Sequence, residues 1–166
     1  VHFLVDTEIA SHIHLLKHRI SSLNAESARY KELKKDKFYI PGDWDNIYNS
    51  MDLEFSDHVL NLNIEYGEVE WQELLESYTN LGNYLYHNSI TDLQEVLGRK
   101  RAKESARYFK TYNSQIEGDV SFNMRSFNNF LKLRNSEHAQ LEIREVAKEM
   151  LELVKNINGN PFEHTI

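Results

Sequence analysis

Residues 123–144 read NMRSFNNFLKLRNSEHAQLEIR, and this stretch predicts two consecutive helices. In the first, over residues 126–134, three apolar side chains share one face at helical spacing: Phe127, Phe130 and Leu131. Arg134 follows on the same face, which turns its guanidinium toward a core or an interface. A guanidinium buried there without a partner is very costly, so the pattern indicates either a bound anion or carbonyl, or a structural ion pair.

The second helix of this stretch is predicted over residues 137–155. Its apolar stripe repeats at helical spacing: Ala139, Ile143, Val146, Met150 and Val154. Two strands are predicted outside it, at residues 1–6, where alternate positions suggest a mostly buried strand, and at residues 116–122.

A helix over residues 7–19 is expected to follow the first strand. Thr7 and Glu8 can cap it. One face of this helix carries a predicted apolar stripe: Ile9, Ile13 and Leu16. Residues 20–30 are then interpreted as a polar loop.

The middle of the chain has weaker patterns. FYIPGDW at residues 38–44 predicts a short strand that stops at its proline and glycine. Residues 44–98 are acidic and helix-like, with a plausible stripe at Leu74, Leu75, Tyr78, Leu81 and Leu85. A helix is expected to continue over residues 104–110.

Length and composition limit the class of protein. With 166 residues, the chain is expected to form one domain, over residues 1–166. The net charge of -7 disfavours a binder of nucleic-acid polymers. A mean hydropathy of -0.62 predicts a thin core, which burial between subunits would supplement. Without an apolar run of membrane-spanning length or a leader-like segment, the protein is expected to be soluble and cytoplasmic, with no membrane partner.

The absence of cysteine restricts the chemistry. It excludes disulfides, thiolate zinc sites and cysteine nucleophiles together. His14 and His18 are four residues apart, a spacing that can chelate zinc, but no third ligand is evident. Two histidines on a polar helix face are the better interpretation, and no metal is predicted.

Residues 17–30, KHRISSLNAESARY, concentrate hydrogen-bond donors at the end of a predicted helix. Hydroxyls, ammonium and guanidinium groups all favour phosphate oxygens. Composition alone would favour an exposed basic loop over an anion site.

Taken in order, these motifs resemble the flavin-dependent thymidylate synthases of the ThyX type. The family pattern RHR, seven residues, then Ser is matched by Lys17, His18, Arg19 and Ser27. The match continues through residues 28–30 and FYIP, resumes at residues 105–107, and extends from residue 123 to residue 144. This resemblance implies a helix-rich α+β fold, in which helices flank an antiparallel sheet, and a homotetramer with active sites at subunit interfaces.

The resemblance also implies two sets of site residues. Those that would bind FAD are Lys17, His18, Arg19, Asn123, Arg125, Asn129, His138, Asn160 and Glu163. Those that would bind dUMP are His14, Lys17, Ala25, Glu26, Ser27, Ala28, Arg29, Arg107 and Arg134.

The implied reaction methylates dUMP to dTMP with methylenetetrahydrofolate, while bound FAD relays hydride from NADPH. Arg134 would be catalytic, stabilising the charge that develops on the uracil ring, which needs no cysteine. Ser27 has no base beside it in the sequence and is expected to bind substrate rather than attack it.

Several positions depart from the family pattern. Lys17 replaces an arginine, Ala25 replaces a glutamate, His14 replaces a glutamine, and residues 111–119 are more polar. These changes leave two alternatives: hydroxymethylation or another modification of a pyrimidine nucleotide, and a catalytically silent assembly protein with the family fold.

The end of the chain, NGNPFEHTI, is similar to the family segment that precedes the first strand. Joining Ile166 to Val1 gives PFEHTIVHFLVD, which predicts that residues 156–166 precede residue 1 structurally, in a circularly permuted or reordered chain.

Overall fold

The computed structural model describes residues 1–18, 20–27, 32–47, 69–160 and 163–164. Within these residues it contains three strands in one antiparallel sheet and five α-helices, so the predicted helix-rich α+β class is confirmed. The chain divides into two compact units, residues 1–26 with 116–166, and residues 27–115. Each unit is described separately below.

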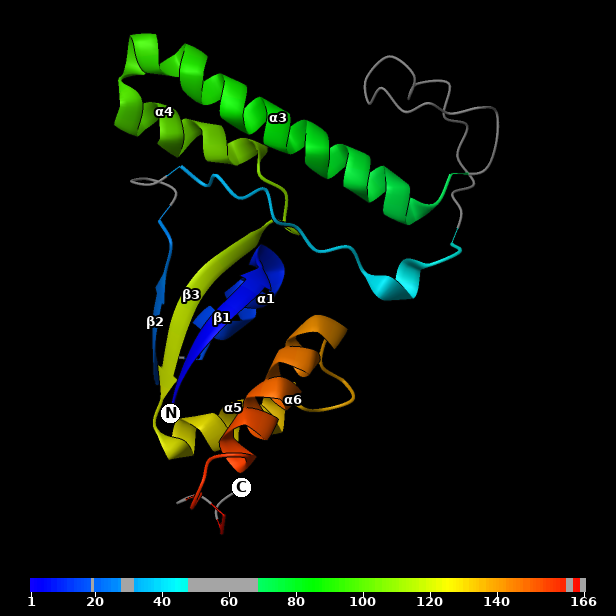
Figure 1. Ribbon diagram of the computed structural model, residues 1–166, viewed down its shortest axis with the longest axis vertical. Helices are drawn as coiled ribbons and strands as arrows, with labels where there is room; N and C mark the ends of the chain where they lie inside the picture. The colour runs from blue at the N-terminus through cyan, green and yellow to red at the C-terminus, as the bar shows by residue number, and fades with distance from the viewer. Residues whose placement is uncertain (19, 28–31, 48–68, 161–162, 165–166) are drawn as a thin grey trace. The chain divides into compact units, whose positions relative to one another are not determined.

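The first unit is built on the sheet, whose strands are β1 (His2–Glu8), β2 (Ser21–Ala25) and β3 (Gln115–Phe122) in the order β1-β3-β2 (Figure 1). β3 confirms the strand predicted at residues 116–122. Val1 N donates to Phe122 O and Phe122 N donates to Val1 O, both at 2.8 Å, which starts the pairing of β1 with β3.

β2 corrects the predicted polar loop at residues 20–30. It pairs antiparallel with β3, from Ser21 opposite Phe122 to Ala25 opposite Gly118. A Cβ on Gly118 would lie 2.8 Å from Asn24 O, so this pairing requires glycine there. The apolar pattern of β2 is weak, because only Leu23 and Ala25 are apolar among its five residues; both lie on its less exposed side, and Leu23 packs against the core.

Three helices complete the first unit: α1 (Ile9–Leu16), α5 (Met124–Arg134) and α6 (Leu141–Lys155). α1 begins at the predicted cap, where the Glu8 carboxylate accepts a 3.0 Å hydrogen bond from Ser11 N. Asn123 Oδ1 caps α5 in the same way, accepting from Ser126 N at 2.9 Å. α6 begins four residues later than predicted, because residues 137–140 form a turn.

The core of the first unit lies between β1, β3, α5 and α6. Its buried side chains are Phe3, Val5, Leu15, Val120, Phe122, Phe127, Phe130, Ile143, Ala147, Met150 and Val154. The predicted stripes of α5 and α6 supply much of this core. The predicted stripe of α1 is wrong: Ile13 and Leu16 are exposed, and Ser11 and Leu15 are buried. Because the Ser11 side chain is small, the backbone of α1 can lie close to the core at that position. A hydropathy pattern does not predict this, since serine is polar.

The second unit is a helical hairpin of α3 (Trp71–Leu97) and α4 (Arg99–Ala106), joined at Gly98, whose φ of 76° favours glycine. The 3-10 turn η2 (Arg107–Phe109) follows α4. The predicted stripe of α3 is only partly right: its four leucines are half-buried and Tyr78 is exposed. The fully buried positions are Thr79, Gly82, Asn83, Tyr86 and Ile90. Polar partners from residues 32–41 and 110–114 cover these positions, so they need not be apolar.

The strand predicted at residues 38–44 is reduced to one bridge between Phe38 and Ser114, followed by the 3-10 turn η1 (Gly42–Trp44). Asn113 supports the bridge by donating to Tyr39 O at 3.0 Å. The helix predicted from residue 44 begins at Trp71 in the described part of the chain, and residues 48–68 lie outside it.

Candidate active site

A cavity of about 390 Å³ lies in the first unit, between the end of α1 and one side of α5. Its lining residues are Lys17, His18, Ile20, Arg125, Ser126, Asn129, Leu133 and Arg134. Five of these eight were predicted as site residues, from two stretches of sequence more than 100 residues apart. The volume falls within the range typical of small-molecule sites.

Arg134 and His18 are joined directly inside this cavity: Arg134 Nε donates to His18 Nε2 at 3.1 Å. An arginine nitrogen can only donate, so His18 Nε2 must be unprotonated, which makes the imidazole neutral with its proton on Nδ1. Burial, then the charge of Arg134 and then His14, lower the pKa of His18, in agreement with this geometry. Both side chains are half-buried.

Phe130 fixes the orientation of the histidine. Its ring centroid lies 5.0 Å from that of His18, in an edge-to-face arrangement. Phe130 is fully buried and packs on Phe122, with centroids 5.2 Å apart. The aromatic core of the first unit therefore continues to the wall of the cavity.

His14 lies one helical turn before His18 and is half-buried. Burial, then the charges of Arg134 and Lys17, lower its pKa against an opposing effect of Glu8. Its Nδ1 is buried and has no hydrogen-bond partner among the described residues. A buried nitrogen of this kind is costly unless a ligand or water satisfies it, so His14 is a candidate polar contact near Arg134.

Cations dominate the cavity. Lys17, Arg125 and Arg134 line it, and none of its eight lining residues is acidic. The chain as a whole has a net charge of -7, so the positive charge of this cavity is a local exception, and it favours an anionic ligand.

Three residues that line the cavity were not predicted: Ile20, Ser126 and Leu133. Leu133 could have been found, since it follows Arg125 and Asn129 at intervals of four.

Other residues predicted to bind FAD lie outside the lining of this cavity. Asn123 uses its side-chain oxygen to cap α5. His138 is exposed in the turn before α6, where its backbone N–H donates to Ser136 Oγ at 3.3 Å. Glu163 is exposed after α6, and its N–H donates to Asn160 O at 3.3 Å.

The residues predicted to bind dUMP are distributed differently. Ala25 and Glu26 line a separate cavity of about 330 Å³ at the end of β2, together with Asn24 and residues 117–119. Ser27 and Arg107 belong to the second unit, where Ser27 is exposed and Arg107 begins η2. Ala28 and Arg29 lie outside the described residues, as does Arg19 of the set predicted to bind FAD.

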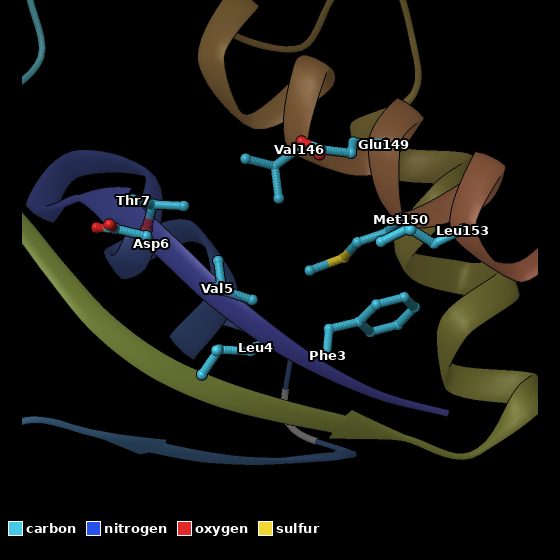
Figure 2. A pocket seen from close by; sticks show the side chains of 9 residues that line it. All are labelled: Phe3, Leu4, Val5, Asp6, Thr7, Val146, Glu149, Met150 and Leu153. Atoms are coloured by element: carbon cyan, nitrogen blue, oxygen red, sulfur yellow. The ribbon is translucent and has the colours of Figure 1, made fainter.

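A third cavity, of about 300 Å³, lies between β1 and α6 and was not predicted (Figure 2). Apolar side chains line it from both elements: Phe3 and Val5 from β1, and Met150 from α6. Glu149, also on α6, adds a carboxylate to the lining. It shares no residue with the cavity of His18 and Arg134, and it lacks that cavity's cations.

The described residues contain no group of three or more histidine, aspartate or glutamate side chains arranged to hold a metal ion. Among them, no helix is long and apolar enough to cross a membrane.

Fold and site together define an α+β protein with a cationic cavity in which a neutral histidine accepts a hydrogen bond from a guanidinium. The chain belongs to the thymidylate synthase complementing protein family, whose model matches residues 1–158.

Its relatives include flavin-dependent thymidylate synthases. That of Thermosipho africanus is 33% identical over 139 residues, which cover 84% of this chain and 56% of the relative. The enzyme of Thermosipho melanesiensis is 32% identical, over 92% of this chain and 62% of the relative. The enzyme of Rickettsia bellii is also 32% identical, over 84% of this chain and 49% of the relative. The chain thus spans about half to three fifths of the length of these relatives.

Proposed function

We propose that this protein is a flavin-dependent thymidylate synthase, which methylates dUMP to dTMP with methylenetetrahydrofolate and uses NADPH as reductant. FAD would supply the hydride chemistry when bound. The observation that carries the proposal is the hydrogen bond between Arg134 and His18 inside a cationic cavity, in a chain of this family.

The cavity suits the anionic part of FAD. Lys17, Arg125 and Asn129 offer ammonium, guanidinium and amide donors on one wall, which match phosphate oxygens. Ser126 adds a hydroxyl beside them. The remaining proposed FAD contacts are Arg19, Asn123, His138, Asn160 and Glu163.

Arg134 is the proposed catalytic residue. Within the described part of the chain, its only hydrogen bond uses Nε, so both terminal nitrogens remain available to a ligand. A fixed positive charge beside the uracil ring would stabilise negative charge as it develops on N3 and O2, and a half-buried setting strengthens that effect. His18 would hold the guanidinium in place without adding a competing positive charge.

The proposed dUMP contacts are His14, Lys17, Ala25, Glu26, Ser27, Ala28, Arg29, Arg107 and Arg134. Among these residues, Arg29 and Arg107 would bind the phosphate of dUMP through charge-assisted hydrogen bonds, and the Ser27 hydroxyl would donate another hydrogen bond to it. Their assembly into one site, across subunits of a homotetramer, is part of the proposal.

The single domain and the permuted position of residues 156–166 stay predictions. The family match runs through residues 1–158 in the printed order. Sequencing of the transcript that encodes both ends of the chain tests the permuted order.

The proposed function is tested by a visible spectrum of the purified protein, followed by anaerobic reduction and addition of dUMP with methylenetetrahydrofolate. We expect flavin absorbance, flavin oxidation that depends on dUMP, and a product with the mass of dTMP. A product heavier by one oxygen would indicate hydroxymethylation instead. A colourless protein that binds no added FAD would contradict the proposal and support a silent assembly protein.

A further inference from the structure

A polar cluster in the second unit connects α3 to the coil of residues 32–36 and to the turn after η2. His87, on α3, lies between two carboxylates: Nδ1 is 3.0 Å from Glu32 Oε1, and Nε2 is 3.0 Å from Asp36 Oδ1 and Oδ2. Ionised carboxylates only accept hydrogen bonds, so both ring nitrogens must donate and His87 is an imidazolium in this arrangement.

Lys110 is the second cation of the cluster. Its Nζ donates to Asp36 Oδ1 at 2.8 Å and to Asn83 Oδ1 at 2.6 Å, and lies 4.5 Å from the centre of the Tyr86 ring. The Lys110 side chain is only 5% exposed, so these partners replace nearly all of its water.

Asp36 is therefore shared by two cations from different segments. Burial alone would raise the pKa of Asp36, but hydrogen bonds from Lys110 and His87 lower it below its ordinary value. The carboxylate stays charged, and it joins residues 32–36 to the turn that contains Lys110.

Tyr86 adds an uncharged contact to the same coil. Its hydroxyl accepts a 3.0 Å hydrogen bond from Leu33 N, and its ring is fully buried with Leu33 packed against it. The coil is thus fixed on α3 at three successive points: Glu32, Leu33 and Asp36.

The turn that Lys110 fixes carries one of the proposed phosphate ligands, Arg107. Arg107 precedes Lys110 by three residues, and Lys110 N donates to Arg107 O at 3.1 Å, which closes the turn. We propose that His87, Asp36 and Lys110 are positioning residues, which hold the Arg107 turn in the arrangement that binds the phosphate of dUMP.

This inference rests on the proposed function, since it requires dUMP to be the substrate. It assigns His87 a role through other residues, without contact with the nucleotide. Exposed ion pairs contribute little to stability, and His87, Glu32 and Asp36 are each about a third exposed. The principal effect of breaking the cluster is therefore expected on the geometry of the phosphate site.

The test measures binding of dUMP and of deoxyuridine, which lacks the phosphate, to the FAD-loaded protein by titration calorimetry. His87→Gln and Asp36→Asn are compared with His2→Gln, which breaks an exposed histidine–carboxylate pair in the first unit, 3.1 Å from Asp119. We expect the Kd for dUMP to rise about tenfold in the first two variants, as for loss of a charged hydrogen bond. Their Kd for deoxyuridine, their FAD content and all properties of His2→Gln should stay within about twofold of wild type.

Unchanged dUMP affinity in His87→Gln and Asp36→Asn would overturn the inference, and so would an equal loss of affinity for deoxyuridine. If neither variant folds, Glu32→Gln decides, because it leaves the Tyr86 and Lys110 contacts intact. That variant should bind dUMP more weakly than wild type, and normal binding would overturn the inference. A wild-type protein that binds FAD but not dUMP would instead contradict the proposed function.

Discussion

Arg134 Nε lies 3.1 Å from His18 Nε2, so a permanent cation donates to a neutral imidazole in the cavity wall. This relationship makes the protonation state of His18 part of the site. A proton on His18 Nε2 would remove the acceptor and place two positive charges in contact.

The pH dependence of stability follows from the lowered pKa values. The pKa values of His12, His14 and His18 are all below the ordinary 6.5, with burial as the first cause. Above pH 6.5 both folded and unfolded chains are neutral at these positions, so their contribution is fully present. As pH falls below 6.5, the unfolded chain takes up protons first, and the free energy of unfolding decreases until the folded-state pKa values are passed.

Urea unfolding at pH 7.5, 6.5 and 5.5 checks this expectation. In His18→Gln one such histidine is absent, so the decrease between pH 6.5 and 5.5 should be smaller than in wild type. A stability that rises on acidification through this window would refute the assignment of neutral histidines.

Replacement of Arg134 tests the electrostatic role. Arg134→Ala should lower the rate of dUMP-dependent flavin oxidation by about 100- to 1000-fold, as for loss of one charge-stabilising donor in other enzymes. Arginine can donate from Nε to His18 while its two terminal nitrogens face the substrate. Lysine keeps the positive charge but has a single nitrogen, so Arg134→Lys should recover only part of the rate.

Stopped-flow absorbance gives these rates, and the flavin content of each variant is the control, because the other lining residues remain. Near-normal turnover in Arg134→Ala would remove the catalytic assignment.

Phe130 and Phe127 form a matched pair for separating core stability from site geometry. Both are fully buried, and their ring centroids are 6.4 Å apart, but the described ring contacts place only Phe130 against His18. Phe130→Leu and Phe127→Leu should each destabilise the fold by about 1 kcal/mol. Only Phe130→Leu should also weaken FAD binding, because it frees the imidazole that holds Arg134.

Thermal unfolding and FAD titration of the two variants provide the measurement. Equal FAD affinities at equal stability loss would show that Phe130 does not position His18.

Gly82 tests the packing of the turn that carries Arg107. A Cβ at Gly82 would lie 2.6 Å from Phe109 O, so Gly82→Ala must displace the backbone of η2 from α3. Alanine gains about 1 kcal/mol of helix propensity, but a backbone clash costs about 1 to 3 kcal/mol, and we expect net destabilisation. Calorimetric unfolding checks it, and Gly42→Ala is the control, since nothing lies within 4 Å of its Cβ. An increase in stability for Gly82→Ala would show that η2 yields at little cost.

The sequence predicted the elements whose stability comes from local pattern. The stripe of Phe127 and Phe130, the cap at Glu8 and the strand at residues 116–122 all depend on spacing along one segment, and the structure contains each of them. β2 was missed, because a five-residue strand with only two apolar side chains, Leu23 and Ala25, gives too short a pattern, and its pairing with β3 is made by residues about 100 positions away.

The fully buried positions of α3 were also missed, for a related reason. Thr79, Asn83 and Tyr86 are buried because residues distant in sequence supply their hydrogen-bond partners, and hydropathy cannot anticipate those partners.

By itself, the sequence determined the residue types of the site: a lysine, histidines and arginines in two motifs, in a chain without cysteine. Only the tertiary structure decided that Arg134 meets His18, that the imidazole is neutral, and that Ala25 and Glu26 line a different cavity. The physical reason is that hydrogen bonds and pKa values depend on distances across the fold, and spacing along one segment does not specify these distances.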